Sequence, residues 1–482
     1  MDTIENRTFD ELRVGDSASL TRTLTRKDIA LFAVMSGDVN PAHVDDEYAR
    51  SDMFHKVIAH GMWSGALVST VLGTLLPGPG TIYLGQSLRF LKPIGLGDSV
   101  TVTLTVTRLE PDKRRVALDC AVTNQDGQRV VAGTADVIAP AEKVARPRVA
   151  LPEVSLRAPG THYRALLAAA GAAPRVTTAV VHPVDAASLR GALDAAAHGL
   201  VEPVLVGPVA RIRQAAAAAG AGLDGVRLVD VPHSQAAAEA AVALARAGEV
   251  QALMQGALSS RELLRAVLER ERGLRTGRRI SHVYAADVPA CPRPLLITDA
   301  AINIRPTLEH KRDIVQNAVD LAQALGIAAP RVAILSALET VYAKLPSTIE
   351  AAALCKMAER GQIGGALVDG PMAFDLAVAD EAAAGRGFTS PVAGRADILV
   401  VPDLEAGDML ARQLAYLADA QVAGIVLGAR VPIVLAGRGD GPLARLASCA
   451  LAALLARRAL VAAAAPSVAQ GTEQGPAQGT VQ

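Results

Sequence analysis

The chain has 482 residues, too many for one compact core, so we expect about two to four domains. Its 48 basic and 48 acidic residues cancel, which leaves no net field to recruit nucleic acid or an anionic membrane. The four cysteines are scattered and form no CxxC pair, which argues against a zinc site or a disulfide framework and fits a reducing cytosol. We therefore expect no metal, no bound cofactor, no nucleic-acid partner and a cytoplasmic location.

Both ends of the chain bear on membrane association. Residues 1–7 lack the apolar core of an export signal. The apolar stretch Leu446–Ala465 contains Arg457 and Arg458, which favours a buried terminal helix over a membrane span. We expect no contact with a membrane.

The first 140 residues predict an α+β domain. Residues 98–108 and 115–124 alternate apolar with polar side chains, in the period of two that is typical of strands with one buried face. Asp126-Gly127 is a hairpin signal. Helices are predicted over 26–35 and over 58–75, and the second is the candidate for a central helix. A helix followed by an antiparallel sheet is the order expected of a hot-dog fold.

Prolines at positions 140, 147, 152 and 159 punctuate the next stretch, so we assign residues 141–160 to a linker. From about Tyr163 onward, alanine-rich helices alternate with short apolar strands, which predicts βα units with parallel strands. The predicted strands are 204–207, 295–298, 332–335, 398–401 and 433–435. Residues 467–482 are rich in Gly and Gln and are expected to be disordered.

The run Ser36-Gly-Asp-Val-Asn-Pro-Ala-His43-Val-Asp45 carries a carboxylate and an imidazole five residues apart. Two such groups on one cavity can hold a water, take a proton from it and return a proton to the product. Together with Ile58-Ala-His-Gly-Met62 and Pro77-Gly-Pro-Gly-Thr-Ile-Tyr-Leu-Gly-Gln-Ser-Leu-Arg-Phe90, the run resembles the signature of the MaoC-like (R)-specific enoyl-CoA hydratases.

That resemblance implies that Asp38 and His43 activate a water for addition to an enoyl thioester. The Gly61 amide, at the head of the central helix, would face the thioester oxygen, where negative charge develops. Asn40 and Ser69 match positions of the family pattern and are expected to orient this set. His60 is expected to pack beside the site rather than to act as a base. The alternative is that Asp38 and Asn40 are ordinary turn residues and that His43 is a surface histidine.

Four runs in the second half resemble the phosphate acetyl/butyryltransferase family: Thr298-Asp-Ala-Ala-Ile-Asn-Ile-Arg-Pro-Thr307, Val368-Asp-Gly-Pro-Met-Ala-Phe-Asp-Leu-Ala377, Ser390-Pro-Val-Ala-Gly-Arg-Ala-Asp397 and Val401-Pro-Asp-Leu-Glu-Ala-Gly407. The resemblance implies an α/β fold of two subdomains over residues 161–466, with the active site in the cleft between them. The first subdomain would be 161–290 plus 430–466, and the second 291–429.

This family places a Ser-Arg pair, followed by an acidic residue, after the last strand. The resemblance carries catalytic roles to Arg438 and Asp440, while Gly437 stands where the family has serine. Asp408 also replaces a usual asparagine. Alone, Arg438 would be an exposed loop arginine and Asp440 a turn residue between glycines.

The two resemblances together imply an enzyme of acyl-CoA metabolism. It would hydrate trans-2-enoyl-CoA to (3R)-3-hydroxyacyl-CoA and transfer a short acyl group between CoA and phosphate. By fold analogy, the hot-dog half should form at least a dimer. One alternative is an active hydratase with a non-catalytic, CoA-binding or oligomerisation C-terminal half. Another is a first half that only binds acyl-CoA or cleaves thioesters.

Overall fold

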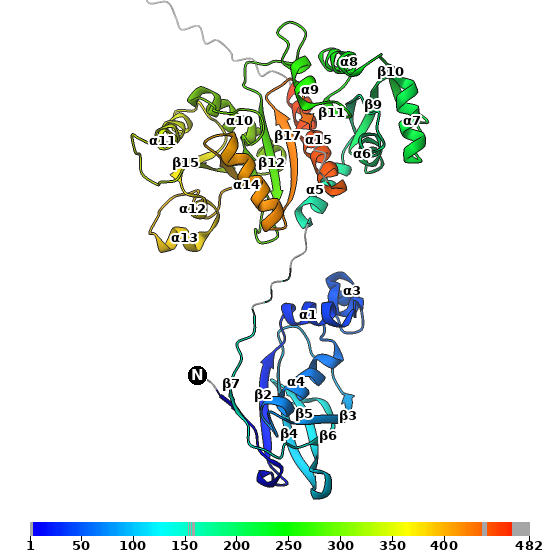
Figure 1. Ribbon diagram of the computed structural model, residues 1–482, viewed down its shortest axis with the longest axis vertical. Coiled ribbons are helices and arrows are strands. Elements are labelled where there is room, and N and C mark those ends of the chain that lie inside the picture. The colour runs from blue at the N-terminus through cyan, green and yellow to red at the C-terminus, as the bar shows by residue number, and fades with distance from the viewer. Residues whose placement is uncertain (1–2, 153, 155, 157–159, 436–440, 465–482) are drawn as a thin grey trace, which may run out of the picture. The chain divides into compact units, whose positions relative to one another are not determined.

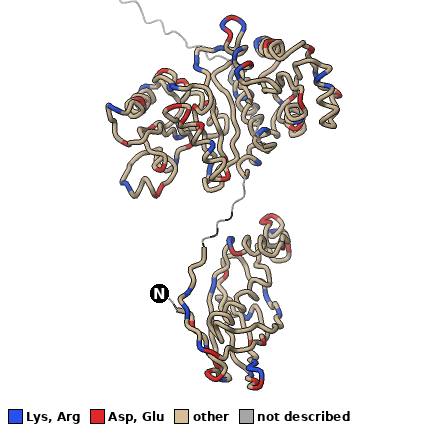
Figure 2. The backbone as a smooth tube through the Cα atoms, viewed as in Figure 1, with Lys and Arg blue, Asp and Glu red and all other residues tan. Residues whose placement is uncertain are grey.

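The computed structural model describes residues 3–152, 154, 156, 160–435 and 441–464. Its contacts divide the chain into two compact units, unit 1 at Met1–Leu156 and unit 2 at Arg157–Gln482 (Figure 1). Basic and acidic side chains are interspersed along both units (Figure 2). Among the described residues, no helix combines the length and apolar character needed to cross a membrane.

Unit 1 is built on a five-stranded antiparallel sheet in the order β2-β4-β5-β6-β3. Its strands are β2 (Ser17–Thr23), β3 (Ile82–Phe90), β4 (Ser99–Glu110), β5 (Arg115–Asn124) and β6 (Arg129–Ile138). Along β4 and β5 every second side chain is buried, so the alternation read from the sequence faces one core. The predicted hairpin between β5 and β6 is confirmed, with Gly127 at φ +72°.

The sheet packs around α4 (Gly61–Thr74), which is the central helix of a hot-dog fold. Its buried side chains include Trp63, Leu67, Val68 and Leu72. The predicted helix over 26–35 is confirmed as α1 (Arg26–Ser36), which begins at a Thr25–Asp28 capping box. Shorter helices complete the unit: α2 (Pro41–Val44), α3 (Asp46–Ser51) and the 3₁₀ helices η1 (Phe9–Glu11) and η2 (Pro111–Lys113).

Part of the range assigned to a linker is ordered on unit 1. Strand β7 (Ala145–Pro147) pairs antiparallel with β1 (Thr3–Glu5). The Asn6 amide also donates to Glu142 O at 2.8 Å, and its Oδ1 accepts from Val144 N at 2.9 Å. These contacts use backbone groups and one buried asparagine, so the proline-rich composition gave no sign of them.

Unit 2 contains one eleven-stranded sheet, in the order β10-β9-β8-β11-β18-β17-β12-β13-β16-β14-β15. The strands are β8 (Val176–Val181), β9 (Val201–Gly207), β10 (Arg227–Asp230), β11 (Ala252–Gln255), β12 (Ser281–Asp287), β13 (Leu295–Thr298), β14 (Arg331–Leu335), β15 (Leu367–Met372), β16 (Ile398–Val400), β17 (Gln421–Leu427) and β18 (Ile433–Val434). It runs without a break through both predicted subdomain ranges.

The expectation of parallel strands throughout is wrong at the middle of this sheet. Strand β12 is antiparallel to both of its neighbours, β13 and β17, and β17 is antiparallel to β18. The connections 288–294 and 428–432 explain the β12–β13 and β17–β18 pairs, because both are shorter than the dozen or so residues that a parallel crossover needs. The strands on either side pair in parallel.

Helices cover the sheet of unit 2 (Figure 1). They are α5 (Thr161–Gly171), α6 (Ala186–Ala197), α7 (Val209–Ala219), α8 (Ser234–Arg246), α9 (Ser260–Val267), α10 (Leu308–Ala324), α11 (Pro346–Glu359), α12 (Phe374–Val378), α13 (Asp380–Gly385), α14 (Leu404–Leu417) and α15 (Pro442–Ala464). The last helix, α15, packs on α5, α6 and β17, as expected of a buried terminal helix.

Candidate active sites

The first candidate site lies where the segment after α1 meets the head of α4. Gly37 ends α1 at φ +76°, and two side chains then shape the turn. Asp38 Oδ1 accepts from the amide of Asn40, and Asn40 Oδ1 accepts from the amide of Ala42, both at 3.2 Å. Asp38 and Asn40 therefore do make the turn contacts that the alternative interpretation foresees, while both side chains stay exposed to solvent.

A backbone carbonyl from another segment holds His43 in one tautomer. Its Nδ1 lies 2.9 Å from the carbonyl oxygen of Ile58. Because a carbonyl only accepts, Nδ1 must carry the proton, and the neutral ring then has a free lone pair on Nε2. The half-buried His43 side chain is thus oriented to accept a proton through Nε2.

His60 completes the cluster. Its Nε2 donates to the backbone oxygen of Asp38 at 3.0 Å, and its ring centroid lies 4.0 Å from that of His43. The residue is 2% exposed, and its Nδ1 has no hydrogen-bond partner among the described residues. The same tautomer argument leaves a lone pair on this Nδ1. Sequence reasoning gave His60 a packing role and did not foresee that it stacks on His43.

Asp38, His43 and His60 each offer one ligand-type atom, and these atoms lie within 4.8 Å of one another. Two ligands of a tetrahedral zinc ion, bound at about 2.0–2.1 Å, lie roughly 3.4 Å apart, so this spacing is loose for zinc. It leaves room for a water. The expectation of no metal remains a prediction.

Gly61 begins α4 and is exposed to solvent. The first amides of a helix have no intrahelical acceptor, so the Gly61 N–H is available to an oxyanion. A Cβ at Gly61 would lie 3.3 Å from two ring carbons of Phe90, so a larger residue here would have to shift that ring slightly. Ser69 is exposed eight residues further along α4, about 12 Å by the helical rise, so the structure does not bring it into this cluster.

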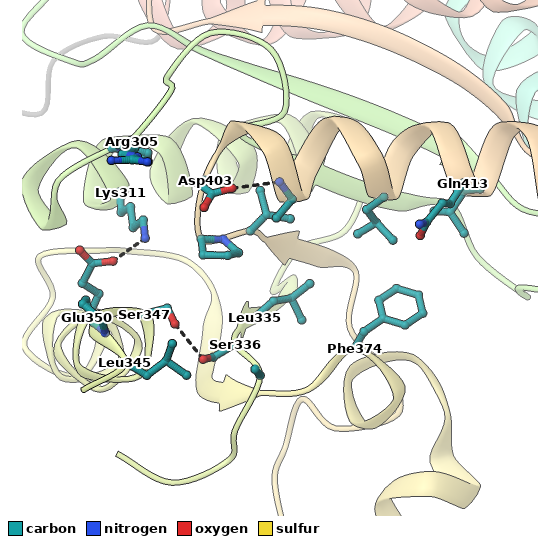
Figure 3. Close-up of a pocket in the computed structure, with 18 of the residues that line it drawn as sticks. Arg305, Lys311, Leu335, Ser336, Leu345, Ser347, Glu350, Phe374, Asp403 and Gln413 are labelled. Atoms are coloured by element: carbon teal, nitrogen blue, oxygen red, sulfur yellow. Dashed lines mark hydrogen bonds and ion pairs between the residues drawn. The ribbon is translucent and has the colours of Figure 1, made fainter. Parts of the chain in front are cut away.

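The second candidate site is a pocket of about 920 Å³ in unit 2 (Figure 3). It lies at the carboxyl ends of β14 and β16 and is bounded by α10, α11, α12 and α14. Ligands of α/β sheets commonly bind at such strand ends. The lining residues all fall within the range 291–429, so this pocket lies inside one predicted subdomain rather than between the two.

One end of this pocket is polar. Lys311, only 4% exposed, makes an ion pair with Glu350 at 2.5 Å, and Arg305 lies beside it (Figure 3). Ser336 and Ser347 share a hydrogen bond of 2.9 Å. Sequence reasoning missed Lys311, Glu350, Ser336 and Ser347, since isolated polar residues on helices and in loops usually face solvent.

Much of the rest of the lining is apolar. Its side chains are Leu335, Leu345, Phe374, Leu410, Leu414 and Leu417, with Gln413 among them. The pocket therefore combines two cations and two carboxylates, those of Glu350 and Asp403, with a largely apolar lining.

A buried carboxylate shapes the loop that carries Arg305. Asp299, 3% exposed, accepts from the amides of Ala301, Ile302 and Asn303 at 3.0 to 3.1 Å. Burial raises the pKa of Asp299, and these hydrogen bonds oppose the rise. Asp299 has no room to bind a ligand as well, so its part is to fix the loop.

Arg438, Asp440 and Gly437 lie outside the described residues, in the connection between β18 and α15. Their predicted roles remain predictions. Asp408 lies on α14, where its Oδ2 accepts from Arg412 Nε at 2.7 Å. This is an ordinary i,i+4 ion pair on a helix surface and gives Asp408 no part in the 920 Å³ pocket.

Residues 233–453 match the family described as phosphate acetyl/butaryl transferase. A phosphate acetyltransferase of Rhizobium meliloti is 60% identical over 296 residues, 61% of this chain and 94% of the relative. The chain belongs to the phosphate acetyl/butyryltransferase family. A phosphate butyryltransferase of Clostridium acetobutylicum is 40% identical over 278 residues, 58% of this chain and 92% of that protein.

Solved structures of this family agree with the fold of unit 2. The crystal structure of a branched-chain phosphotransacylase from Enterococcus faecalis is 30% identical, covers 58% of this chain and 99% of its own, and gives a TM-score of 0.52. Residues 14–126, in unit 1, match the description MaoC like domain. The fusion of the two families read from the sequence is thus confirmed.

Proposed function

We propose that this chain is a bifunctional enzyme that hydrates trans-2-enoyl-CoA to (3R)-3-hydroxyacyl-CoA and transfers a short acyl group between CoA and phosphate. The observation that carries the first activity is the convergence of Asp38, His43 and His60 within a MaoC-like domain, with His60 directly before Gly61 at the start of α4. Family membership, with 60% identity to a phosphate acetyltransferase, carries the second.

In the hydration step, a water between Asp38 and His43 would lose a proton to His43 Nε2 as its oxygen bonds to the β-carbon of the enoyl group. The electron pair of the double bond moves toward the thioester, whose oxygen is stabilised by the Gly61 amide at the helix start. A proton returned to the α-carbon completes the addition of water. The Ile58 carbonyl keeps His43 in the tautomer that can accept.

In the transfer step, Arg305 and Lys311 in the 920 Å³ pocket, which also holds the carboxylates of Glu350 and Asp403, are the candidates to bind a phosphate or acyl-phosphate group, and the leucine and phenylalanine side chains of the lining suit a short acyl chain. Arg305 offers a planar pair of donors to phosphate oxygens. The ammonium group of Lys311 is paired with Glu350 in the free protein. It would therefore bind an anion through those of its N–H groups that do not point at Glu350. Lys311→Met should therefore raise the KM for phosphate several-fold and leave crotonyl-CoA hydration unchanged.

The assay pair that tests this function uses the purified chain. Hydration is followed as loss of enoyl absorbance from crotonyl-CoA, and transfer as phosphate-dependent release of CoA from acetyl- or butyryl-CoA. Hydration without any phosphate-dependent release would favour the alternative of a non-catalytic second half, for which the absence of the family serine at Gly437 is the specific observation.

We also propose a cytoplasmic homo-oligomer. Strand β3 ends the sheet of unit 1, and Ile82, Leu84 and Phe90 on it are 46 to 57% exposed. An edge strand with exposed apolar side chains is a site for pairing with a second copy. Light scattering should give at least the mass of a dimer, and a monomeric mass at micromolar concentration would contradict this.

A further inference from the structure

A second pocket in unit 2, of about 550 Å³, belongs to neither site above. It lies where the segment before β12, helix α10, the end of β17 and helix α15 meet. We call it the arginine pocket, because its lining includes Arg278, Arg430 and Arg458 against a single carboxylate, Asp320. It is bounded by both predicted subdomain ranges, at the amino end of β18.

Backbone contacts hold two of these arginines on adjacent loops. The amide of Arg430 donates to Leu274 O at 2.9 Å. Thr276 Oγ1 donates to Gly428 O at 2.6 Å and accepts from the amide of Arg278 at 3.1 Å. The loop that carries Arg278 is therefore fixed to the loop that carries Arg430, and both residues line the same pocket.

The charges in the arginine pocket do not balance. Arg278 Nη1 pairs with Asp320 at 2.5 Å. Arg458 Nη2 donates to the neutral side chain of Gln323 at 2.5 Å, and Arg430 makes no ion pair with any described residue. Three cations against one carboxylate leave two positive charges facing one cavity. Guanidinium groups prefer the paired oxygens of phosphate or carboxylate.

The remaining wall is apolar and consists of Leu427, Pro432, Leu455 and Ala459. The volume falls within the range of about 300–1,000 Å³ that is usual for small-molecule sites, and a lone phosphate would leave most of it unfilled. We propose that the arginine pocket binds a nucleoside diphosphate, with the two phosphates on Arg430 and Arg458 and the base against the apolar wall. CoA contains the same chemical group, so the ligand is either a free nucleotide or that part of CoA.

Isothermal titration of the full chain with ADP tests this proposal. Arg430→Gln and Arg458→Gln should each weaken ADP binding at least about tenfold, since each loses a charge-assisted contact. Arg213→Gln is the matched control, because Arg213 is an exposed arginine on α7 that lines neither pocket. The control should bind ADP within twofold of the wild type, and all variants should keep the wild-type melting temperature.

Two further titrations identify the ligand. Pyrophosphate should bind more weakly than ADP, and equal binding would overturn the role given to the apolar wall. Displacement of ADP by CoA supports the pocket with CoA as the source of the nucleotide, and no displacement supports a free nucleotide. Wild-type binding of ADP weaker than about 1 mM, or arginine variants that bind like Arg213→Gln, would overturn the proposal.

Discussion

Replacing His43 by alanine should lower enoyl-CoA hydration at least a hundredfold and leave acyl transfer unchanged. The imidazole is the group whose free Nε2 can take the proton of the attacking water, and removal of a positioned acid or base typically costs about 10²–10⁴-fold. A hundredfold loss corresponds to about 2.7 kcal/mol in the activation free energy.

The loss of stability in this variant should be smaller. The ring of His43 makes one hydrogen bond, to Ile58 O, and stacks on His60. One such hydrogen bond contributes about 0.5–1.5 kcal/mol, against a typical domain stability of about 5–15 kcal/mol. The variant should therefore remain folded, and the rate loss cannot be attributed to unfolding. Crotonyl-CoA hydration and a thermal melt on the same sample measure the two effects.

His55→Asn is the matched control. His55 is exposed, its Nδ1 lies 3.2 Å from the carbonyl oxygen of Arg50, and its φ of +55° is a value that asparagine tolerates. This variant should hydrate at the wild-type rate. A folded His43→Ala protein with near wild-type hydration would refute the reasoning, and so would an equal loss in the control.

Three other predictions concern stability and the second half. Burial lowers the pKa of His282 from 6.5 to about 4. Between these two values the unfolded chain takes up a proton at this position and the folded chain does not. The free energy of unfolding is therefore at its full value above about pH 6.5 and falls as the pH drops toward 4. Thermal melts at pH 7 and 5 should show that His282→Leu reduces this loss, and an unchanged pH dependence would contradict it. A fragment 1–152, which keeps the β1–β7 pair, should melt above a fragment 1–142, and equal melting temperatures would mean that this pair contributes nothing. Gly437→Ser, which restores the family serine, should raise the rate of phosphate-dependent CoA release, and no release from either protein would favour a non-catalytic second half.

The helix α1 and the strands β4 and β5 of unit 1 were predicted because their patterns are local. Alternation over 98–108 and over 115–124 follows from neighbours in the sequence. The reversal at β12 and β17 was not foreseen, since it depends on which strands lie side by side and the parallel expectation rested on βα alternation alone. The short connection 288–294 was the available signal.

The candidate sites were likewise predictable only where their residues lie close together in the sequence. Asp38 and His43 lie in one run, so a sequence motif alone is enough to associate them. The stacking of His60 on His43 and the Lys311–Glu350 pair join residues 17 and 39 positions apart, and nothing in their spacing distinguishes them from surface residues. Such contacts depend on how helices pack, which the sequence pattern leaves open.

The place of β18 in the sheet has a consequence for how the protein is made. Strand β11 ends at Gln255, but its second neighbour, β18, begins only at Ile433. A ribosome adds about 5–20 residues per second, so one edge of β11 leaves the tunnel roughly 10–35 s before its partner. Over that time the nascent chain exposes an unpaired strand edge, Ala252 to Met254, whose residues are buried in the folded protein. Such an edge can pair with strands of other chains. Growing cells therefore have a reason to keep a chaperone on this chain until its last fifty residues have been translated.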